Sequence, residues 1–307
     1  MKQAVKATPF KWFILIILIV AVGIGLWRSG RLDKVIPSTV ERRTGEVTFI
    51  HTGKQFATTL APGWTAGETK KGLQTLIYPA NTKLTSGNIT ELLAKDIILL
   101  EVSTNQLASY EELIKELKLR AEKTKARVDV SEEKYNKLPA TRMTIRGTDT
   151  YEQVIFNTPS IVTVTYKIDH PVVKQILDTL TIDLSPYASD IAKASAVTRD
   201  MRGYIAENNF KVMYTHVSES LKKNNTEKDL STLLKGTSLD FNNQALIWGV
   251  YLSDTGIATS SNLIREGLVF RRFTLYFTRE KDAIKLDGLR ISPAIISESK
   301  PSPTAKK

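Results

Sequence analysis

The pattern of apolar and polar residues along this chain starts with one long apolar run near the N-terminus. It covers residues 10–27 and carries a single charged residue, near its start. At about 1.5 Å per residue, a helix of this length reaches roughly 27 Å, close to the thickness of the hydrocarbon core of a bilayer. Trp12 and Trp27 lie at its two ends, where aromatic side chains favour the membrane interface. The pattern predicts a transmembrane helix over residues 12–27, preceded by a cytoplasmic tail over residues 1–11.

A cleaved secretory signal is the alternative interpretation of this run. The run is longer than the apolar core of a usual signal, and the residues that follow, WRSGRLDK, are bulky and basic and offer no small-residue cleavage site. Two orientation signals conflict, because basic residues are slightly more numerous after the span, whereas long domains translocate largely regardless of charge. We expect an uncleaved anchor with its C-terminal domains outside the cytoplasm.

Beyond the span, a linker over residues 28–45 leads into strands and helices over residues 46–184. The linker carries Gly, Pro, Ser and charged residues without a period, as a stalk does. Residues 161–168 then alternate between apolar and polar, which predicts an antiparallel strand with one covered face. Residues 109–121 show helical spacing after a capping box, and residues 172–180 carry a second apolar stripe. We therefore expect two amphipathic helices packed on an antiparallel sheet.

Short motifs mark this first region. Pro62, Gly63 and Trp64 follow an early strand, Leu138 and Pro139 precede a central strand, and the last helix ends near residue 180. In these motifs and in the order of its elements, the region resembles the PsbP-like family. The resemblance implies an αβα sandwich, usually lumenal or extracytoplasmic, that acts as an accessory or assembly module. It brings no family-wide catalytic motif.

The second region, residues 187–297, begins with helices and ends with strands. Ala194, Met201 and Ile205 recur at helical spacing, and the last two strands are joined by the polar turn at residues 279–282. The ending LVFRRFTLYFTREKDAIKLDGLRIS, with this charged hairpin, is similar to nuclear transport factor two-like domains. The resemblance implies a cone-shaped α+β domain whose curved antiparallel sheet wraps a long helix. We expect residues 44–184 and 187–297 each to fold alone.

Candidate binding residues come from the strands of this second region. Trp248, Arg272, Phe273 and Tyr276 could line a pocket inside the cone. The simplest interpretation of the apolar members is ordinary core, because any sheet of this size needs such residues. An open cone could instead carry a small apolar ligand. It could also host an acid–base enzyme, for which the chain offers a set of suitable residue types: Asp240, Tyr214, Tyr251 and Tyr276.

Composition narrows the function classes. The formal net charge is +11, but residues 44–184 carry seventeen basic and seventeen acidic residues, so the excess lies largely around the span and in the tail. Nucleic-acid binding needs basic residues gathered on a folded domain and is not expected. The chain has no cysteine, which excludes thiol nucleophiles, disulfides and Cys-ligated metals. His51, His170 and His216 lack a second ligand at helical spacing, so neither a metal site nor a cofactor is predicted.

These observations predict a single-pass bacterial membrane protein that displays two α+β modules outside the cytoplasm and binds without catalysing a reaction. Its expected partners are the lipid bilayer and an unidentified protein or cell-envelope component. Small residues at Ala21 and Gly25 could let two spans pack into a homodimer. The acidic pair at residues 132–133 reads as a solvated turn, and the tail over residues 298–307 as disordered.

Overall fold

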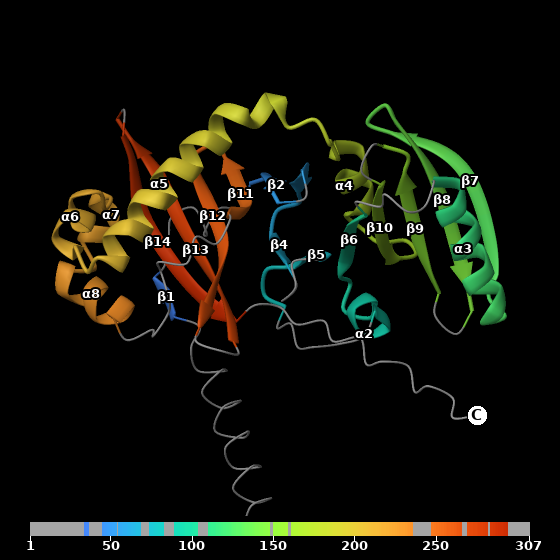
Figure 1. Cartoon of the computed structure of the whole chain (residues 1–307), viewed down its shortest axis with the longest axis horizontal. Helices are drawn as coiled ribbons and strands as arrows, with labels where there is room; N and C mark the ends of the chain where they lie inside the picture. Colours follow the sequence, from blue (N-terminus) through green and yellow to red (C-terminus); the bar gives the residue numbers. More distant parts are fainter. Residues whose placement is uncertain are drawn as a thin grey trace, which may run out of the picture.

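The computed structural model describes most of the chain after the predicted span. The described residues are 34–36, 45–53, 55–68, 74–82, 89–103, 110–147, 150–158, 161–235, 247–265, 269–281 and 283–293. They form a mixed α+β fold with two seven-stranded sheets, in which neighbouring strands pair antiparallel (Figure 1). This confirms the expected class. The predicted span at residues 12–27 and the tail at residues 298–307 lie outside this part, and none of the helices inside it is long and apolar enough to cross a membrane.

Sheet A carries the C-terminal strands and, at both of its ends, strands from the N-terminal part of the chain. Its spatial order is β1 (Lys34–Ile36), β14 (Ala283–Pro293), β13 (Val269–Glu280), β12 (Gly256–Arg265), β11 (Ile247–Ser253), β2 (Val47–His51) and β3 (Phe56–Leu60). Strand β1 falls inside the segment predicted to be an unpatterned linker. It pairs with β14, because three residues suffice to extend an existing sheet edge even without a period of their own.

Helices cover one face of sheet A. They are η1 (Ser185–Tyr187), α5 (Ala188–Ala206), α6 (Phe210–Thr215), α7 (Glu219–Lys222) and α8 (Glu227–Lys235). The long helix α5 runs across the strands in Figure 1 and buries the predicted stripe of Ala194, Met201 and Ile205. Beside it, Met213 of α6 packs in one apolar cluster with Phe273 of β13. Burial of one face of each helix supplies the hydrophobic stabilisation of this layer.

Sheet B is built from the remaining strands. Its spatial order is β4 (Trp64–Glu68), β5 (Gln74–Pro79), β6 (Ile98–Ser103), β10 (Ile161–Lys167), β9 (Thr150–Phe156), β8 (Leu138–Arg146) and β7 (Arg127–Tyr135). Helices α2 (Ile89–Leu93) and α3 (Tyr110–Lys123) pack on one face through apolar clusters, and α4 (Val173–Thr179) packs on the other. The strand and the two helices expected from the alternation and the helical stripes are all present.

The hairpin β2–β3 belongs to the cores of both sheets. Ile50 is opposite Val250 of β11 and packs in a cluster with Ala194 of α5. On the other face of the hairpin, Phe49 and Phe56 lie in the core cluster of sheet B. Both faces carry buried side chains, and these include the polar residues His51 and Thr58, so the hairpin does not show the apolar–polar alternation of a half-exposed strand. The sheets therefore do not divide between residues 184 and 187, where the change of pattern placed the domain boundary.

Polar contacts also join strand β4 to sheet A. The Tyr251 hydroxyl donates to the carbonyl oxygen of Ala66 at 2.8 Å, and Nη1 of Arg272 donates to the same oxygen at 3.3 Å. Ala66 has no exposed surface. Near this junction a β-carbon on Gly53 would lie 2.6 Å from the ring of Trp248, so only glycine fits there without movement. Strand β4 thus shares buried hydrogen bonds with sheet A, and the turn after β2 packs on β11 with little room for adjustment.

His170, which packs beside strand β4 of sheet B, gives the fold a pH dependence. Its Nε2 lies 3.0 Å from the carbonyl oxygen of Asp96, its ring meets the Trp64 ring edge to face at 5.3 Å, and burial lowers its pKa. The unfolded chain then binds more protons than the folded one, so stability is full above about pH 6.5 and is lost as pH falls below it. Denaturant unfolding of wild type and His170→Gln at pH 7.5 and 5.5 should show a smaller pH-dependent loss in the variant. Equal losses would contradict this assignment.

Candidate functional site

The four residues predicted to line a cone pocket do not share one cavity. Phe273 points toward the helices and is 1% exposed within the core of sheet A. Arg272 and Tyr276 occupy alternate positions on the same strand and therefore point to the opposite face, where Arg272 reaches the carbonyl of Ala66. Trp248 lies at a register shift of β11, with its ring 6.3 Å from that of His51. The side of sheet A that faces the helices is filled by apolar side chains together with the buried hydroxyl pair of Thr198 and Thr259.

The residue types named for an acid–base enzyme are also dispersed. The Tyr214 hydroxyl donates to the carbonyl of Asn225 at 2.9 Å, and the Tyr251 hydroxyl donates to that of Ala66. Asp240 lies outside the described residues. Within the part of the chain that the structure describes, no three His, Cys, Asp or Glu side chains gather as metal ligands would.

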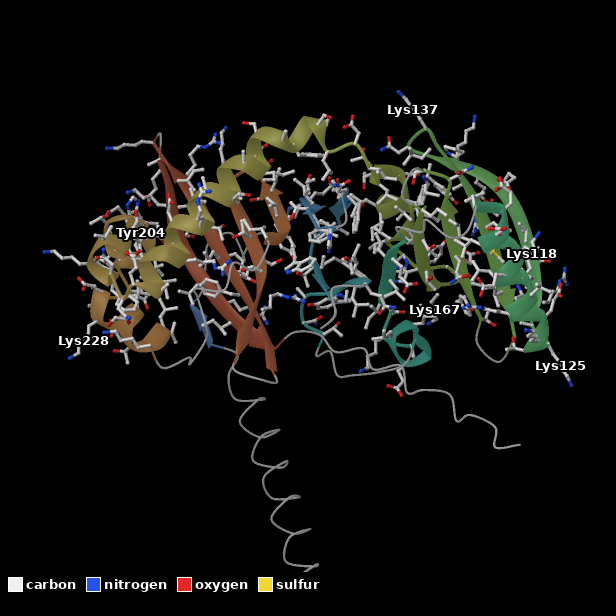
Figure 2. The ribbon with its side chains drawn as sticks, in the orientation of Figure 1. Lys118, Lys125, Lys137, Lys167, Tyr204 and Lys228 are labelled. Atoms are coloured by element: carbon white, nitrogen blue, oxygen red, sulfur yellow. The ribbon has the colours of Figure 1, made fainter. Side chains whose placement is uncertain are left out.

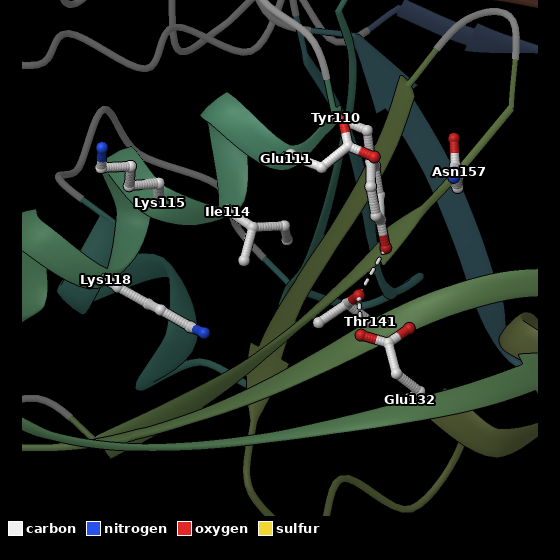
Figure 3. A pocket seen from close by; sticks show the side chains of 8 residues that line it. All are labelled: Tyr110, Glu111, Ile114, Lys115, Lys118, Glu132, Thr141 and Asn157. Carbon is white, nitrogen blue, oxygen red and sulfur yellow. Dashed lines mark hydrogen bonds between the residues drawn. The ribbon is translucent and has the colours of Figure 1, made fainter.

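A cavity of about 410 Å³ lies instead between helix α3 and sheet B (Figure 3). Helix α3 packs on the sheet through Leu113, Ile114 and Leu117, and the cavity lies beside this contact. Its size is within the range of small-molecule sites, and it is widely open to solvent. The lining comes from α3, β7, β8 and the end of β9: Tyr110, Glu111, Ile114, Lys115, Lys118, Glu132, Thr141 and Asn157.

A chain of hydrogen bonds fixes one wall of this cavity. The Tyr110 hydroxyl lies 2.5 Å from Oγ1 of Thr141, which donates in turn to Oε1 of Glu132 at 2.8 Å. Thr141 is 1% exposed, whereas Glu132 is exposed. Burial raises the pKa of Tyr110, so its hydroxyl stays protonated and can serve as a donor. Tyr110 and Thr141 therefore hold the Glu132 carboxylate in a defined orientation at the cavity wall.

Lys118 faces this carboxylate from the helix. In Figure 3 its ammonium group projects from α3 toward the sheet, while Glu132 projects from β7. Lys125 and Lys137, by comparison, extend outward from the ribbon in Figure 2. Within the described residues, no ion pair shorter than 4.0 Å involves either Lys118 or Glu132. Among the charged residues of the lining, Lys118 and Glu132 are thus a cation and an anion that do not neutralise each other directly.

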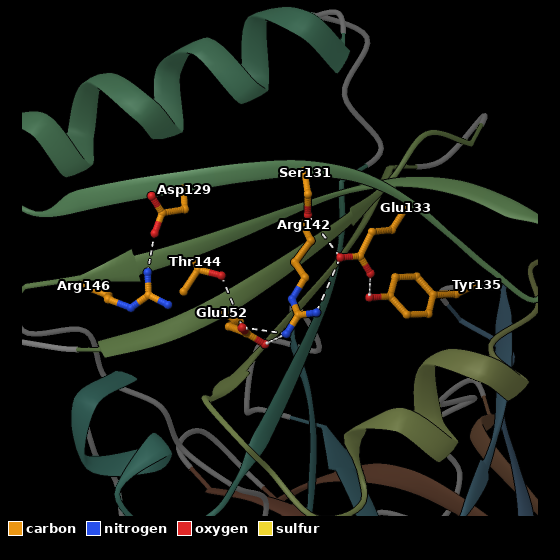
Figure 4. Close-up of polar contacts among 8 residues, drawn as sticks. All are labelled: Asp129, Ser131, Glu133, Tyr135, Arg142, Thr144, Arg146 and Glu152. Carbon is orange, nitrogen blue, oxygen red and sulfur yellow. Dashed lines mark hydrogen bonds and ion pairs between the residues drawn. The ribbon is translucent and has the colours of Figure 1, made fainter.

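The opposite face of the same two strands carries a polar network (Figure 4). Nη2 of Arg142 donates to both carboxylate oxygens of Glu152, each at 2.7 Å, and Nη1 lies 3.4 Å from Oε1 of Glu133. Thr144 donates to Glu152 at 3.2 Å, and the Tyr135 hydroxyl donates to Glu133. Bidentate pairing of this kind is strong and geometrically specific.

The pKa shifts in this network all preserve ordinary charge states. Burial disfavours the charge of Glu133, but hydrogen bonds from Tyr135 and the charge of Arg142 outweigh it and lower the pKa of Glu133. Burial and the neighbouring carboxylates raise the pKa of Tyr135 and Tyr166. Burial also opposes the charge of Arg142, yet its bond to Glu152 raises the Arg142 pKa overall. None of these shifts brings a group toward neutral pH, where a general acid or base works best.

Sequence reasoning missed both polar sites. The residues 132–133 that were predicted to form a solvated turn lie on β7, and the side chains of Glu132 and Glu133 point to opposite faces. The residue types were present in the sequence, because β8 places Thr141 directly opposite Glu132 and Arg142 diagonally from Glu133. Only the pairing of the two strands brings these residues together, and this pairing cannot be deduced from the sequence pattern.

Comparison with protein-family models finds no match for the chain, and comparison with curated protein sequences finds none either. Function must therefore be inferred from the residues themselves.

Proposed function

We propose that this protein is a membrane-anchored, extracytoplasmic binding protein that does not catalyse a reaction. Residues 12–27 anchor it in the bilayer, and the two sheets display a binding site outside the cytoplasm. Its partner is a component of the cell envelope or a protein exported to it. The single observation that carries this proposal is the open cavity beside α3, with Lys118 and Glu132 facing it from separate walls.

The chemistry around the cavity supports binding rather than catalysis. Burial raises the pKa of Tyr110 further above neutral pH, and its hydrogen bonds lead to Thr141 and Glu132 rather than to a nucleophile with an adjacent base. The resemblances point the same way, because PsbP-like domains serve as accessory modules and a cone-shaped domain can act as a plain interaction module. Two copies could associate through the spans, where Ala21 and Gly25 allow close packing.

An apolar carrier that uses the second region is the alternative. It requires an open space between the helices and sheet A. Phe273, Leu275 and Phe277 fill that side together with Met213 and Val217, all nearly fully buried. The packing therefore favours the cavity beside α3 over the cone as the binding site.

Membrane topology is the first test of this function. Protease added to intact spheroplasts should digest the chain beyond about residue 28 and leave a short membrane-embedded N-terminal fragment, because the proposed anchor leaves the rest outside. Immunoblots against an N-terminal and a C-terminal tag measure both products, and an intact cytoplasmic marker protein controls for lysis. Full protection of the C-terminal tag until lysis would contradict the extracytoplasmic placement.

Retention of a partner is the second part of this test. The tagged full chain, crosslinked in membranes and purified, should retain an envelope component that a variant with a filled cavity, Thr141→Trp, loses. Unchanged recovery with the variant would place the binding surface elsewhere. The melting temperature of the variant shows whether the protein is still folded.

A further inference from the structure

The lining of the cavity beside α3 is electrically balanced. It contains two lysines, Lys115 and Lys118, and two glutamates, Glu111 and Glu132. A strongly anionic ligand would be repelled by the carboxylates and a strongly cationic one by the ammonium groups. Ligands that suit this site are therefore neutral overall. Such a ligand is either uncharged or carries one positive and one negative group.

The positions of Lys118 and Glu132 favour a ligand that carries one positive and one negative group. The two side chains enter the cavity from opposite walls, one from helix α3 and one from strand β7 (Figure 3). Within the described residues neither forms an ion pair, and Lys118 is only partly exposed. A ligand that covers both groups must replace the water around two opposite charges, which is costly unless the ligand supplies a carboxylate for one and an ammonium for the other.

We propose that this cavity binds a small zwitterion, an amino acid or a short peptide with free ends. The inference rests on the binding function proposed above and names its ligand. The ligand carboxylate meets Nζ of Lys118. Its ammonium group meets Glu132, whose Oε1 already accepts from Thr141 and whose Oε2 remains for the ligand. Charge-assisted hydrogen bonds at both ends set the orientation.

The rest of the lining suits the body of such a molecule. Ile114 and the Tyr110 ring offer apolar surface beside the two charged positions, and Asn157 is exposed at the end of β9. The volume of about 410 Å³ accommodates an aliphatic amino acid or a dipeptide. Tyr110 and Thr141 act as positioning residues, because they orient Glu132 without touching the ligand charge.

A panel of matched probes tests the ligand class. Calorimetry with the full chain in detergent uses leucine, Leu-Leu, leucine amide (cation only), N-acetyl-leucine (anion only) and glucose (no charge). Leucine or Leu-Leu should bind at least about tenfold more tightly than either singly charged analogue, because each analogue loses one hydrogen bond between charged groups. The tighter of the two tells a free amino acid from a peptide. Equal binding of N-acetyl-leucine, or binding of glucose alone, would overturn the proposal.

Variants locate the site and its polarity. Lys118→Gln and Glu132→Gln should each weaken binding of the zwitterion by at least about tenfold, and Glu132→Gln keeps an acceptor for Thr141. Lys123→Gln, an exposed change at the end of the same helix, serves as the matched control and should leave affinity unchanged. The double exchange Lys118→Glu with Glu132→Lys should recover part of the binding that each single exchange removes, because a zwitterion can reverse its direction.

The outcomes separate the ligand from the function. If the probes fail to bind while crosslinking still retains an envelope partner that Thr141→Trp loses, the zwitterion is wrong and the binding function stands. If neither binds, both fail. If the probes bind but Lys118→Gln and Glu132→Gln leave the affinity as it was, the ligand lies outside this cavity and the proposal is overturned. Melting temperatures of all variants show whether each one is folded.

Discussion

Residues 187–297 expressed alone should fail to give a cooperative unfolding transition. The fragment keeps β11 but loses its partner β2, including the pairing of Val250 with Ile50. It also loses Phe49 from beside the ring of Tyr251, at a centroid separation of 5.0 Å. Each fully buried side chain of this size contributes about 1.5–3 kcal/mol, and a whole domain is stable by only about 5–15 kcal/mol. Thermal melting followed by circular dichroism and hydrogen exchange of β11 measures the result.

A fusion provides the matched control for this fragment. Residues 45–60 joined to residue 185 through a flexible linker should restore exchange protection to β11, because the chain passes close to this point when Ala57 pairs with Thr181. The intact protein should melt in a single transition, since the hairpin contributes one face to each core. A fragment 187–297 that melts cooperatively by itself, with native protection in β11, would show that the hairpin is dispensable.

Replacing Arg142 by methionine should destabilise the protein by about 3 kcal/mol, the lower end of the range for a broken buried pair. The Glu152 side chain is 6% exposed and would lose the guanidinium that contacts both of its oxygens. The loss falls at the lower end because the Arg142 side chain is 37% exposed and water can partly replace it. Denaturant unfolding at neutral pH measures this difference.

Two further variants give this prediction its controls. Arg146→Met removes an ion pair with Asp129 on the same two strands, but both partners are exposed, at 51% and 42%, so the cost should stay below about 1 kcal/mol. In the double variant Arg142→Met with Glu152→Met, the protein should regain much of the lost free energy of unfolding, because the unpaired Glu152 charge is no longer buried. If Arg142→Met costs no more than Arg146→Met, the network does not support the fold.

Local patterns predicted the secondary structure well. Alternation over residues 161–168 corresponds to β10 and the helical stripe beginning at Leu113 to α3, since both depend on contacts within a few residues. The candidate pocket shows the limit of the same reasoning. Adjacent residues such as Arg272 and Phe273 belong to the same strand, yet they face different neighbours, and the pattern alone could not tell an open cone from a filled one.

The cavity beside α3 illustrates what pairing adds. From the sequence alone, Lys118 and Glu132 are interpreted as ordinary charged residues exposed to solvent. Helix packing and the β7–β8 register place them on facing walls, with Thr141 between Tyr110 and Glu132. The spacing of these residues along the chain does not predict that they lie close together, because their proximity depends on which strands are neighbours in the sheet.

By itself the sequence determined the apolar run at residues 12–27, the antiparallel α+β class and most of the elements, because hydrophobic periodicity acts over one or two turns. Only the tertiary structure decided that the hairpin β2–β3 joins sheet A although its chain continues into sheet B. The reason is that each face of the hairpin carries apolar side chains among polar ones, so its sequence suits either sheet. The choice between the sheets depends on the packing partners Val250 and Ala194, which lie more than a hundred residues away.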